Sequence, residues 1–265
     1  SKPTILLDAH IDTVRPSAAW SRDPYDACIE DGRLYGLGSN DTGGSVVSLL
    51  AAFDFLAQRP QPYNLIYLAS AEEEVTGAGG VRAVLGELGH IDFGVVGEPT
   101  GMNPAVAEKG LMVLDCTAHG RAGHAARNEG VNAIYEALPD IERVSPLLGP
   151  VKMTVTGVQA GTQHNVVPAE CRFMVDVRVN ELYTNEELLA EIRRSVGCDV
   201  VPRSTHLCSS SIDVSHPAVR RLVASGRKPF GSPTMSNQAV MPFRTVKVGP
   251  GDSARSHTAD EYICL

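Results

Sequence analysis

The sequence predicts an α/β fold in which a mainly parallel sheet with flanking helices carries an inserted α+β domain. Over residues 4–97, apolar runs of strand length alternate with segments whose apolar residues recur at helical spacing, which is typical of a parallel sheet covered by helices. Over residues 107–209 the predicted order becomes strand, helix, two strands and helix, and the strands alternate like those of an antiparallel sheet. We therefore expect one domain from residues 1–106 and 210–265, and an inserted domain from residues 107–209.

The composition argues against several classes of protein. With 265 residues, 43% of them hydrophobic, the chain can bury one large core or two medium-sized ones. A formal net charge of -8 without a basic run argues against a nucleic-acid partner, and no apolar run is long enough to cross a membrane. The six cysteines form no CxxC pair, so we expect reduced thiols in a cytoplasmic protein rather than disulfides or a zinc knuckle.

The first predicted strand, over residues 4–9, leads directly into His10 and Asp12. Residues two apart in an extended chain point to the same side, so the Asp12 carboxylate can accept the second ring N–H of His10. Such a contact fixes the histidine tautomer for metal binding. The alternative interpretation is a histidine that caps a turn.

Asp41 precedes Gly43 and Gly44 at the entrance to a helix predicted over residues 45–58. Aspartate is a frequent N-cap, which is one interpretation. The two glycines favour another, because they let the backbone come close to a bulky or tightly packed group. Asp41 is therefore a candidate for either a helix cap or a metal ligand.

Carboxylates also follow the next two predicted strands. The glutamate triplet 72–74 comes after the strand 64–70, and Glu98 comes after the strand 93–97, with a helix predicted over residues 77–88 between them. Crowded carboxylates cost free energy unless a cation or a proton offsets their repulsion. A solvated surface is the alternative for such a run of charge.

The inserted domain is predicted to contain strands over residues 111–118, 151–158 and 171–179 and helices over residues 131–144 and 185–196. An exposed edge strand of such a domain is a natural place for two subunits to pair. His124 lies in the loop between the first strand and the first helix, where its residue type alone indicates an ordinary loop histidine. After the insertion, a helix over residues 216–227 and a strand over residues 245–248 precede His257.

The polar residues that follow these strands are expected to meet, because ligand sites of parallel sheets lie beyond the carboxyl ends of the strands. The side chains expected there are His10, Asp41, Glu73, Glu74, Glu98 and His257. Two imidazoles with several carboxylates and no thiolate suit zinc, cobalt or manganese, and there are enough ligands for two ions that share one carboxylate. Such a pair generates hydroxide near neutral pH, and one unligated glutamate would carry the proton.

Five short motifs resemble those of the M20 metallopeptidase and deacylase family, in the family's order: His10-Ile11-Asp12, Asp41 before Gly43-Gly44, Glu73-Glu74, Gly97-Glu98-Pro99-Thr100 and Ser256-His257-Thr258. Within the family the sequence is similar to acetylornithine deacetylases of the bacterial arginine pathway, over nearly the whole chain. The resemblance implies a zinc-exopeptidase-like catalytic domain and an inserted lid domain that pairs two subunits into a homodimer. It also implies that the family's N-terminal segment, its closing helix and a loop near residues 142–147 are absent from this sequence.

The resemblance implies a ligand set for two zinc ions, one held by His10 and Glu98, the other by Glu74 and His257, with Asp41 bridging them. It also implies a cis peptide bond from Asp41 to Thr42. Asp12 would orient His10, and Glu73 would act as the base.

Three residues of the inserted domain are implied to act on the substrate. His124 would donate to the oxyanion at the site of the partner subunit. Asn165 and Arg178 would contact the substrate, Arg178 through a bidentate pair with its α-carboxylate. A surface arginine at the end of a strand is the alternative for Arg178.

Together these implications predict a hydrolase that removes the acyl group from an N-acyl amino acid, in the first place N-acetyl-L-ornithine. Alternatives within the family are deacylases of N-acetylcitrulline, N-succinylornithine or N-succinyl-diaminopimelate, and a dipeptidase. A metal-binding module without turnover is the alternative from a different class. Glu73 distinguishes that module from an enzyme, because binding alone needs no unligated base.

Overall fold

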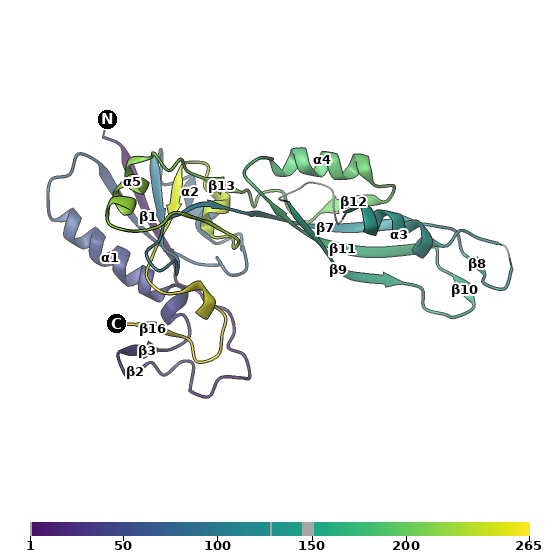
Figure 1. Ribbon diagram of the computed structural model, residues 1–265, viewed down its shortest axis with the longest axis horizontal. Helices are drawn as coiled ribbons and strands as arrows, with labels where there is room; N and C mark the ends of the chain where they lie inside the picture. The colour runs from purple at the N-terminus through teal and green to yellow at the C-terminus, as the bar shows by residue number, and fades with distance from the viewer. Residues whose placement is uncertain (1, 128, 145–150) are drawn as a thin grey trace. The chain divides into compact units, whose positions relative to one another are not determined.

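A computed structural model describes residues 2–127, 129–144 and 151–265 of the chain. The chain forms two compact units, one built from Ser1–Glu108 and Ser210–Leu265, the other from Lys109–Ser209 (Figure 1). The missing loop expected near residues 142–147 falls in part on residues 145–147, which lie outside the described residues. Within the described ranges, no helix combines the length and the apolar character that a bilayer crossing requires.

The first unit is built on a seven-stranded sheet in the order β13-β6-β15-β5-β1-β4, with β14 beside β6. Its strands are β1 (Thr4–His10), β4 (Asn64–Ser70), β5 (Phe93–Val96), β6 (Ala105–Glu108), β13 (Ser210–Ser211), β14 (Phe230–Ser232) and β15 (Thr245–Lys247). The central strands β4, β1, β5 and β15 run parallel, as their short apolar runs predict. β6 runs antiparallel to β13 and β15, so the sheet is mixed.

Helices cover both faces of this sheet. They are α1 (Gly44–Ala57), α2 (Val81–Leu85) and α5 (Pro217–Ala224), with the shorter turns η1 (Ser39–Gly43), η2 (Asn237–Val240) and η3 (Ser253–Arg255). α2 packs with Leu6 and Val96 on one face, whereas Val219 of α5 packs with Val246 on the other. α1 lies against β1 and β4.

A small antiparallel sheet, β16-β3-β2, brings the last described residues beside an early segment. Its strands are β2 (Cys28–Glu30), β3 (Arg33–Tyr35) and β16 (Tyr262–Cys264). Just beyond β3, the backbone N–H of Gly36 donates to the carbonyl of Glu261 over 3.1 Å. The segment that precedes β16 therefore lies next to the segment that leads into η1.

The second unit is a four-stranded antiparallel sheet with two helices on one face. Its strands, in the order β12-β7-β11-β9, are β7 (Gly110–His119), β9 (Lys152–Ala160), β11 (Glu170–Val179) and β12 (Asp199–Pro202), and its helices are α3 (Ala133–Val144) and α4 (Asn185–Ser195). A separate pair joins β8 (Gly123–His124) to β10 (Val166–Val167). Alternate residues of β7 and β11, such as Leu114 and Val175, are buried against Ala137 and Ile192 of the helices.

Candidate metal centre

The parallel register places the candidate ligands at one edge of the first sheet. His10 is the last residue of β1 and lies opposite Ser70, the last residue of β4. On the other side of β1, the N–H of Gly97 donates to the carbonyl of Asp8 over 2.7 Å, directly before Glu98. The carboxyl ends of β4, β1 and β5 therefore deliver their following residues to the same place.

His10 lies among three carboxylates. Its Nε2 is 3.3 Å from Oδ1 of Asp41, 3.9 Å from Oε1 of Glu98 and 4.0 Å from Oε2 of Glu73. Since the side chain of His10 is only 2% exposed, these contacts replace water around the imidazole. One face of the site is thus an imidazole nitrogen surrounded by oxygen donors.

A second histidine lies on the far side of Asp41. Nε2 of His257 is 3.1 Å from Oε1 and 3.0 Å from Oε2 of Glu74, and 3.7 Å from Oδ2 of Asp41. Asp41 therefore directs one carboxylate oxygen toward each imidazole. In the described part of the chain, three groups of possible metal-binding side chains have ligand atoms within 4.8 Å of one another: His10-Asp41-Glu98, Asp41-Glu74-His257 and His10-Glu73-Glu74.

Asp12 contacts both the His10 ring and the turn that carries the glutamates. Nδ1 of His10 lies 2.9 Å from the backbone carbonyl of Asp12, closer than the 3.6 Å to its carboxylate. The carboxylate instead accepts the backbone N–H groups of Glu73 and Glu74, both over 3.2 Å. Asp12 thus contacts the His10 ring through its backbone and holds the glutamate turn through its side chain.

Asp41 lies in the turn η1 and is followed by a cis peptide bond to Thr42, as the family resemblance implies. The backbone of this turn is held by Glu261, a residue for which the sequence predicted no role. Glu261 is 2% exposed and accepts backbone N–H groups of Gly38, Asn40 and Asp41. Its partners are backbone groups, which no side-chain motif reveals.

Asn237 is a second residue whose role the sequence did not indicate. Its amide donates to Oδ2 of Asp8 and to the hydroxyl of Ser70, the residue opposite His10 in the sheet, each over 2.9 Å. Burial raises the pKa of Asp8 to about 6, although hydrogen bonds from Ser70 and Asn237 oppose the shift. Asn237 therefore supplies an uncharged hydrogen-bond donor to Asp8 and Ser70.

The electrostatics of the cluster fit a divalent cation. Burial lowers the pKa of His10, but the hydrogen bond to Asp41 and the charges of Glu98 and Glu73 outweigh it and raise this pKa to about 10. Burial raises the pKa of Glu73 to about 7, and burial together with the charge of Glu73 raises the pKa of Glu98 well above its usual value. The cluster gathers more negative charge than its surroundings accommodate, and an ion among these oxygens would relieve the repulsion. Imidazole and carboxylate donors suit zinc, cobalt and manganese.

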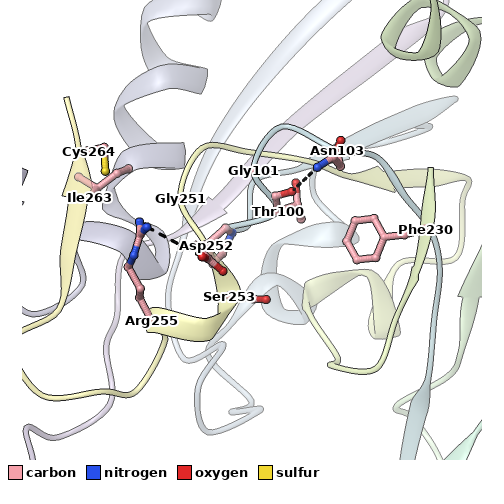
Figure 2. Close-up of a pocket in the computed structure, with 11 residues that line it drawn as sticks. Thr100, Gly101, Asn103, Phe230, Gly251, Asp252, Ser253, Arg255, Ile263 and Cys264 are labelled. Atoms are coloured by element: carbon pink, nitrogen blue, oxygen red, sulfur yellow. Dashed lines mark hydrogen bonds and ion pairs between the residues drawn. The ribbon is translucent and has the colours of Figure 1, made fainter. Parts of the chain in front are cut away.

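A cavity of about 280 Å³ opens over the cluster, and Phe230, Pro233 and Met235 add apolar surface to its lining. A neighbouring cavity of about 520 Å³, shown in Figure 2, shares four lining residues with it: Pro99, Thr100, Phe230 and Ser253. The two cavities therefore adjoin each other within the first unit.

His124 and Asn165 lie close together in the second unit. His124 ends β8, and the N–H of the following Ala125 donates to the backbone carbonyl of Asn165 over 3.0 Å. The His124 side chain is exposed, and its Nδ1 accepts the N–H of Ala126 over 3.1 Å. Among the described residues, no hydrogen bond involves the other ring nitrogen, Nε2.

Arg178 lies on β11, apart from that pair. Its guanidinium donates from Nε and Nη2 to the two carboxylate oxygens of Asp176, over 2.8 Å and 3.0 Å. Residues two apart share one side of a strand, which explains the pair. This pair uses the Nε–Nη2 edge of the guanidinium, and the N–H groups of Nη1 lie outside it.

The sequence profile of peptidase family M20/M25/M40 matches residues 6–265. The chain belongs to this family. Among M20 relatives, an acetylornithine deacetylase of Myxococcus xanthus is 30% identical, over 99% of this chain and 76% of its own length. A succinyl-diaminopimelate desuccinylase of Acidiphilium cryptum (strain JF-5) is 31% identical, over 73% of this chain and 57% of its own length.

Solved structures show the same M20 fold. Aminopeptidase PepT of Bacillus cereus superposes with a TM-score of 0.76 at 19% identity, over 99% of this chain and 76% of its own. A dinuclear metal-binding peptidase of the M20 family from Bacillus subtilis gives a TM-score of 0.65 at 18% identity, over 94% of this chain and 72% of its own. Membership of the family makes this M20 protein a metal-binding hydrolase of amide bonds.

Proposed function

We propose that this chain is a deacylase that uses two divalent metal ions to hydrolyse N-acyl amino acids, with N-acetyl-L-ornithine as the first candidate and L-ornithine and acetate as its products. The observation that carries the proposal is Asp41, whose two carboxylate oxygens face His10 at 3.3 Å and His257 at 3.7 Å. Each imidazole also has a carboxylate of its own, Glu98 beside His10 and Glu74 beside His257. One ion at each imidazole, with Asp41 between them, would use all five ligands.

Glu73 is the proposed base. When bound, the two ions, zinc in the first place with cobalt or manganese as alternatives, would polarise the acyl carbonyl and lower the pKa of the attacking water. Glu73 would take a proton from that water and deliver it to the departing amine. The Asp12 carboxylate accepts the backbone N–H of Glu73 over 3.2 Å, which anchors the backbone of this residue beside the cluster.

The second unit is proposed to form a homodimer and to act on substrate. His124 of one subunit would donate to the oxyanion at the site of the other, and Asn165 and Arg178 would contact the substrate. Within the described strands, β9 pairs with β11 on one side only, which supports pairing between copies at its other edge. We propose the cytoplasm as the compartment, since all six cysteines are free thiols.

A desuccinylase of N-succinyl-diaminopimelate is the second candidate. It is supported by the Acidiphilium cryptum relative, whose 31% identity does not separate it from the 30% of the Myxococcus xanthus relative. The acyl group is therefore decided by assay. The zinc-loaded protein should release ornithine from N-acetyl-L-ornithine faster than diaminopimelate from its succinyl derivative, and the reverse order would select the second candidate.

The variant Glu73→Gln tests the enzyme against a metal-binding module. We expect kcat to fall by roughly 10²–10⁴-fold, with two ions per chain still found by elemental analysis. Glu72→Gln is the matched control, because Glu72 is the adjacent carboxylate but accepts the Gly79 N–H in a turn over 2.7 Å. A Glu73→Gln protein as active as this control would refute Glu73 as the base, and a metal-loaded wild type without turnover on any acyl amino acid would support the module.

A further inference from the structure

We infer that Glu261 is a positioning residue for the metal centre, which fixes the shared ligand Asp41 relative to His257 before any ion binds. The inference rests on the proposed metal centre and concerns how that centre is built. Glu261 touches neither imidazole in any described contact. It acts through the backbone that carries Asp41.

The two oxygens of Glu261 are both occupied by the turn η1. Oε2 accepts the N–H of Gly38 over 2.9 Å, and Oε1 accepts the N–H groups of Asn40 and Asp41 over 2.9 Å and 2.8 Å. The residue is 2% exposed, so water does not compete for these bonds. Three donors that converge on one buried carboxylate define the path of the backbone on the N-terminal side of Asp41.

Only a carboxylate satisfies this arrangement. Its oxygens are both pure acceptors, whereas an amide in the same place would present an N–H₂ group to at least one backbone N–H. A buried donor that loses its acceptor is costly, so the turn would move to find another partner. Because Asp41 is part of that turn, its carboxylate would move with it.

A second attachment joins the same two segments. The Asn40 side chain accepts the N–H of Asp252 over 2.8 Å and donates to the carbonyl of Asp252 over 3.1 Å. Asp252 and Glu261 bracket His257 in the sequence, so η1 is fastened to the His257 loop on both sides of that ligand. His257 itself has φ 60°, a left-handed conformation that persists in a non-glycine residue where neighbouring contacts hold it.

These contacts fix the distance between Asp41 and His257 without the help of a bound ion. Asp41 and His257 are 216 positions apart in the sequence (257 - 41), yet Oδ2 of Asp41 lies 3.7 Å from Nε2 of His257. If an ion had to pull these two segments together, part of its binding free energy would be lost in ordering them. Glu261 removes that cost, so it should strengthen metal binding without contacting metal.

Hydrogen exchange in the zinc-free wild-type protein tests preorganisation directly. We expect the amides of Gly38, Asn40 and Asp41 to exchange slowly before zinc is added and to change little afterwards. If these amides exchange like unstructured ones until zinc is added, the ion rather than Glu261 orders the turn, and the inference is overturned. This measurement needs no variant and does not depend on activity.

Zinc titration of the Glu261→Gln variant tests whether Glu261 strengthens metal binding. We expect at least a tenfold weaker affinity for one of the two ions, and faster exchange at the three amides, in a protein whose far-UV circular dichroism is unchanged. Glu261→Asp, which keeps the charge, should recover part of the affinity. Should Glu261→Gln fail to fold, Glu261→Asp is titrated in its place, with a smaller loss of affinity expected and an unchanged affinity overturning the inference.

The neighbouring residue supplies the matched control. Asp260 also accepts backbone N–H groups, but from Ser21 and Arg22, away from the ligand turn. Asp260→Asn should therefore keep the affinity of wild type for zinc. Equal zinc affinities of Glu261→Gln and Asp260→Asn would refute the positioning role, whereas a wild type that binds no zinc would refute the proposed metal centre instead.

Discussion

Replacing Glu108 by glutamine should destabilise the first unit strongly. The Glu108 side chain is 0% exposed, and its Oε2 accepts Nζ of Lys247 over 2.9 Å, the hydroxyl of Ser236 over 2.8 Å and the amide of Gln238 over 2.9 Å. Its Oε1 accepts the N–H of Ser236 over 3.1 Å. Glutamine keeps the shape of the side chain but removes the charge and turns one acceptor into a donor.

The expected loss of stability follows from the polar groups that stay buried after the substitution. Lys247 is 3% exposed, so the substitution leaves its buried ammonium without its ion-pair partner, and at least one N–H or O–H loses its acceptor. Breaking a buried pair on one side costs about 3–5 kcal/mol. For a unit of this size that cost lowers Tm by roughly 6–20 °C.

The assay is urea or thermal unfolding followed by the fluorescence of Trp20, the single tryptophan, which lies in the first unit. Glu30→Gln is the control, because Glu30 pairs with Arg22 in the same unit but is 54% exposed, and such pairs contribute about 0–1 kcal/mol. A Glu108→Gln protein that unfolds at the same urea concentration as Glu30→Gln would refute the reasoning.

Three further outcomes are expected. Thr184→Ala should lower the stability of the second unit by about 1 kcal/mol, measured by circular dichroism, because Thr184 and Glu187 form a capping box at the start of α4. Arg203 holds the pKa of Asp115 below its usual value, so this pair stabilises the folded state above about pH 4 and loses that effect as the pH falls further. Since both side chains are half exposed, Asp115→Asn should remove less than about 1 kcal/mol at pH 7, and the difference from wild type should shrink as the pH falls below 4. Removal of zinc by a chelator should lower the midpoint of unfolding, measured by Trp20 fluorescence, because an ion at a hundred times its Kd stabilises the folded state by about 2.7 kcal/mol per site. An unchanged midpoint would argue against a bound ion.

The clustering of His10, Glu73, Glu74 and Glu98 could be predicted from the sequence because each of these residues follows a recognisable strand. The apolar runs of β1 and β4 and the acidic residues directly after them place His10, Glu73 and Glu74 at one edge of a parallel sheet. The position of Asp41 between His10 and His257 needed the family resemblance, since an N-cap fits the same residue equally well.

Other features could not be predicted, because they depend on short elements and contacts that no repeating pattern of apolar residues indicates. β6 spans four residues, too few for its alternation to be recognised, and the Glu108–Lys247 pair was missed with it. The helix predicted over residues 77–88 shrinks to α2, because the glycine-rich segment before Val81 forms turns instead. The Arg178–Asp176 pair, in contrast, could have been predicted, since alternate residues of a strand share one side.

The division of the chain has a consequence for its synthesis on the ribosome. Residues 109–209 are contiguous, so the second unit can fold as soon as it has emerged. The first unit cannot complete its folding at that stage, because β1 is translated early while His257 and Glu261 come more than two hundred codons later. Nascent chains that stall before these codons would carry a complete second unit and a cluster that lacks His257 and Glu261.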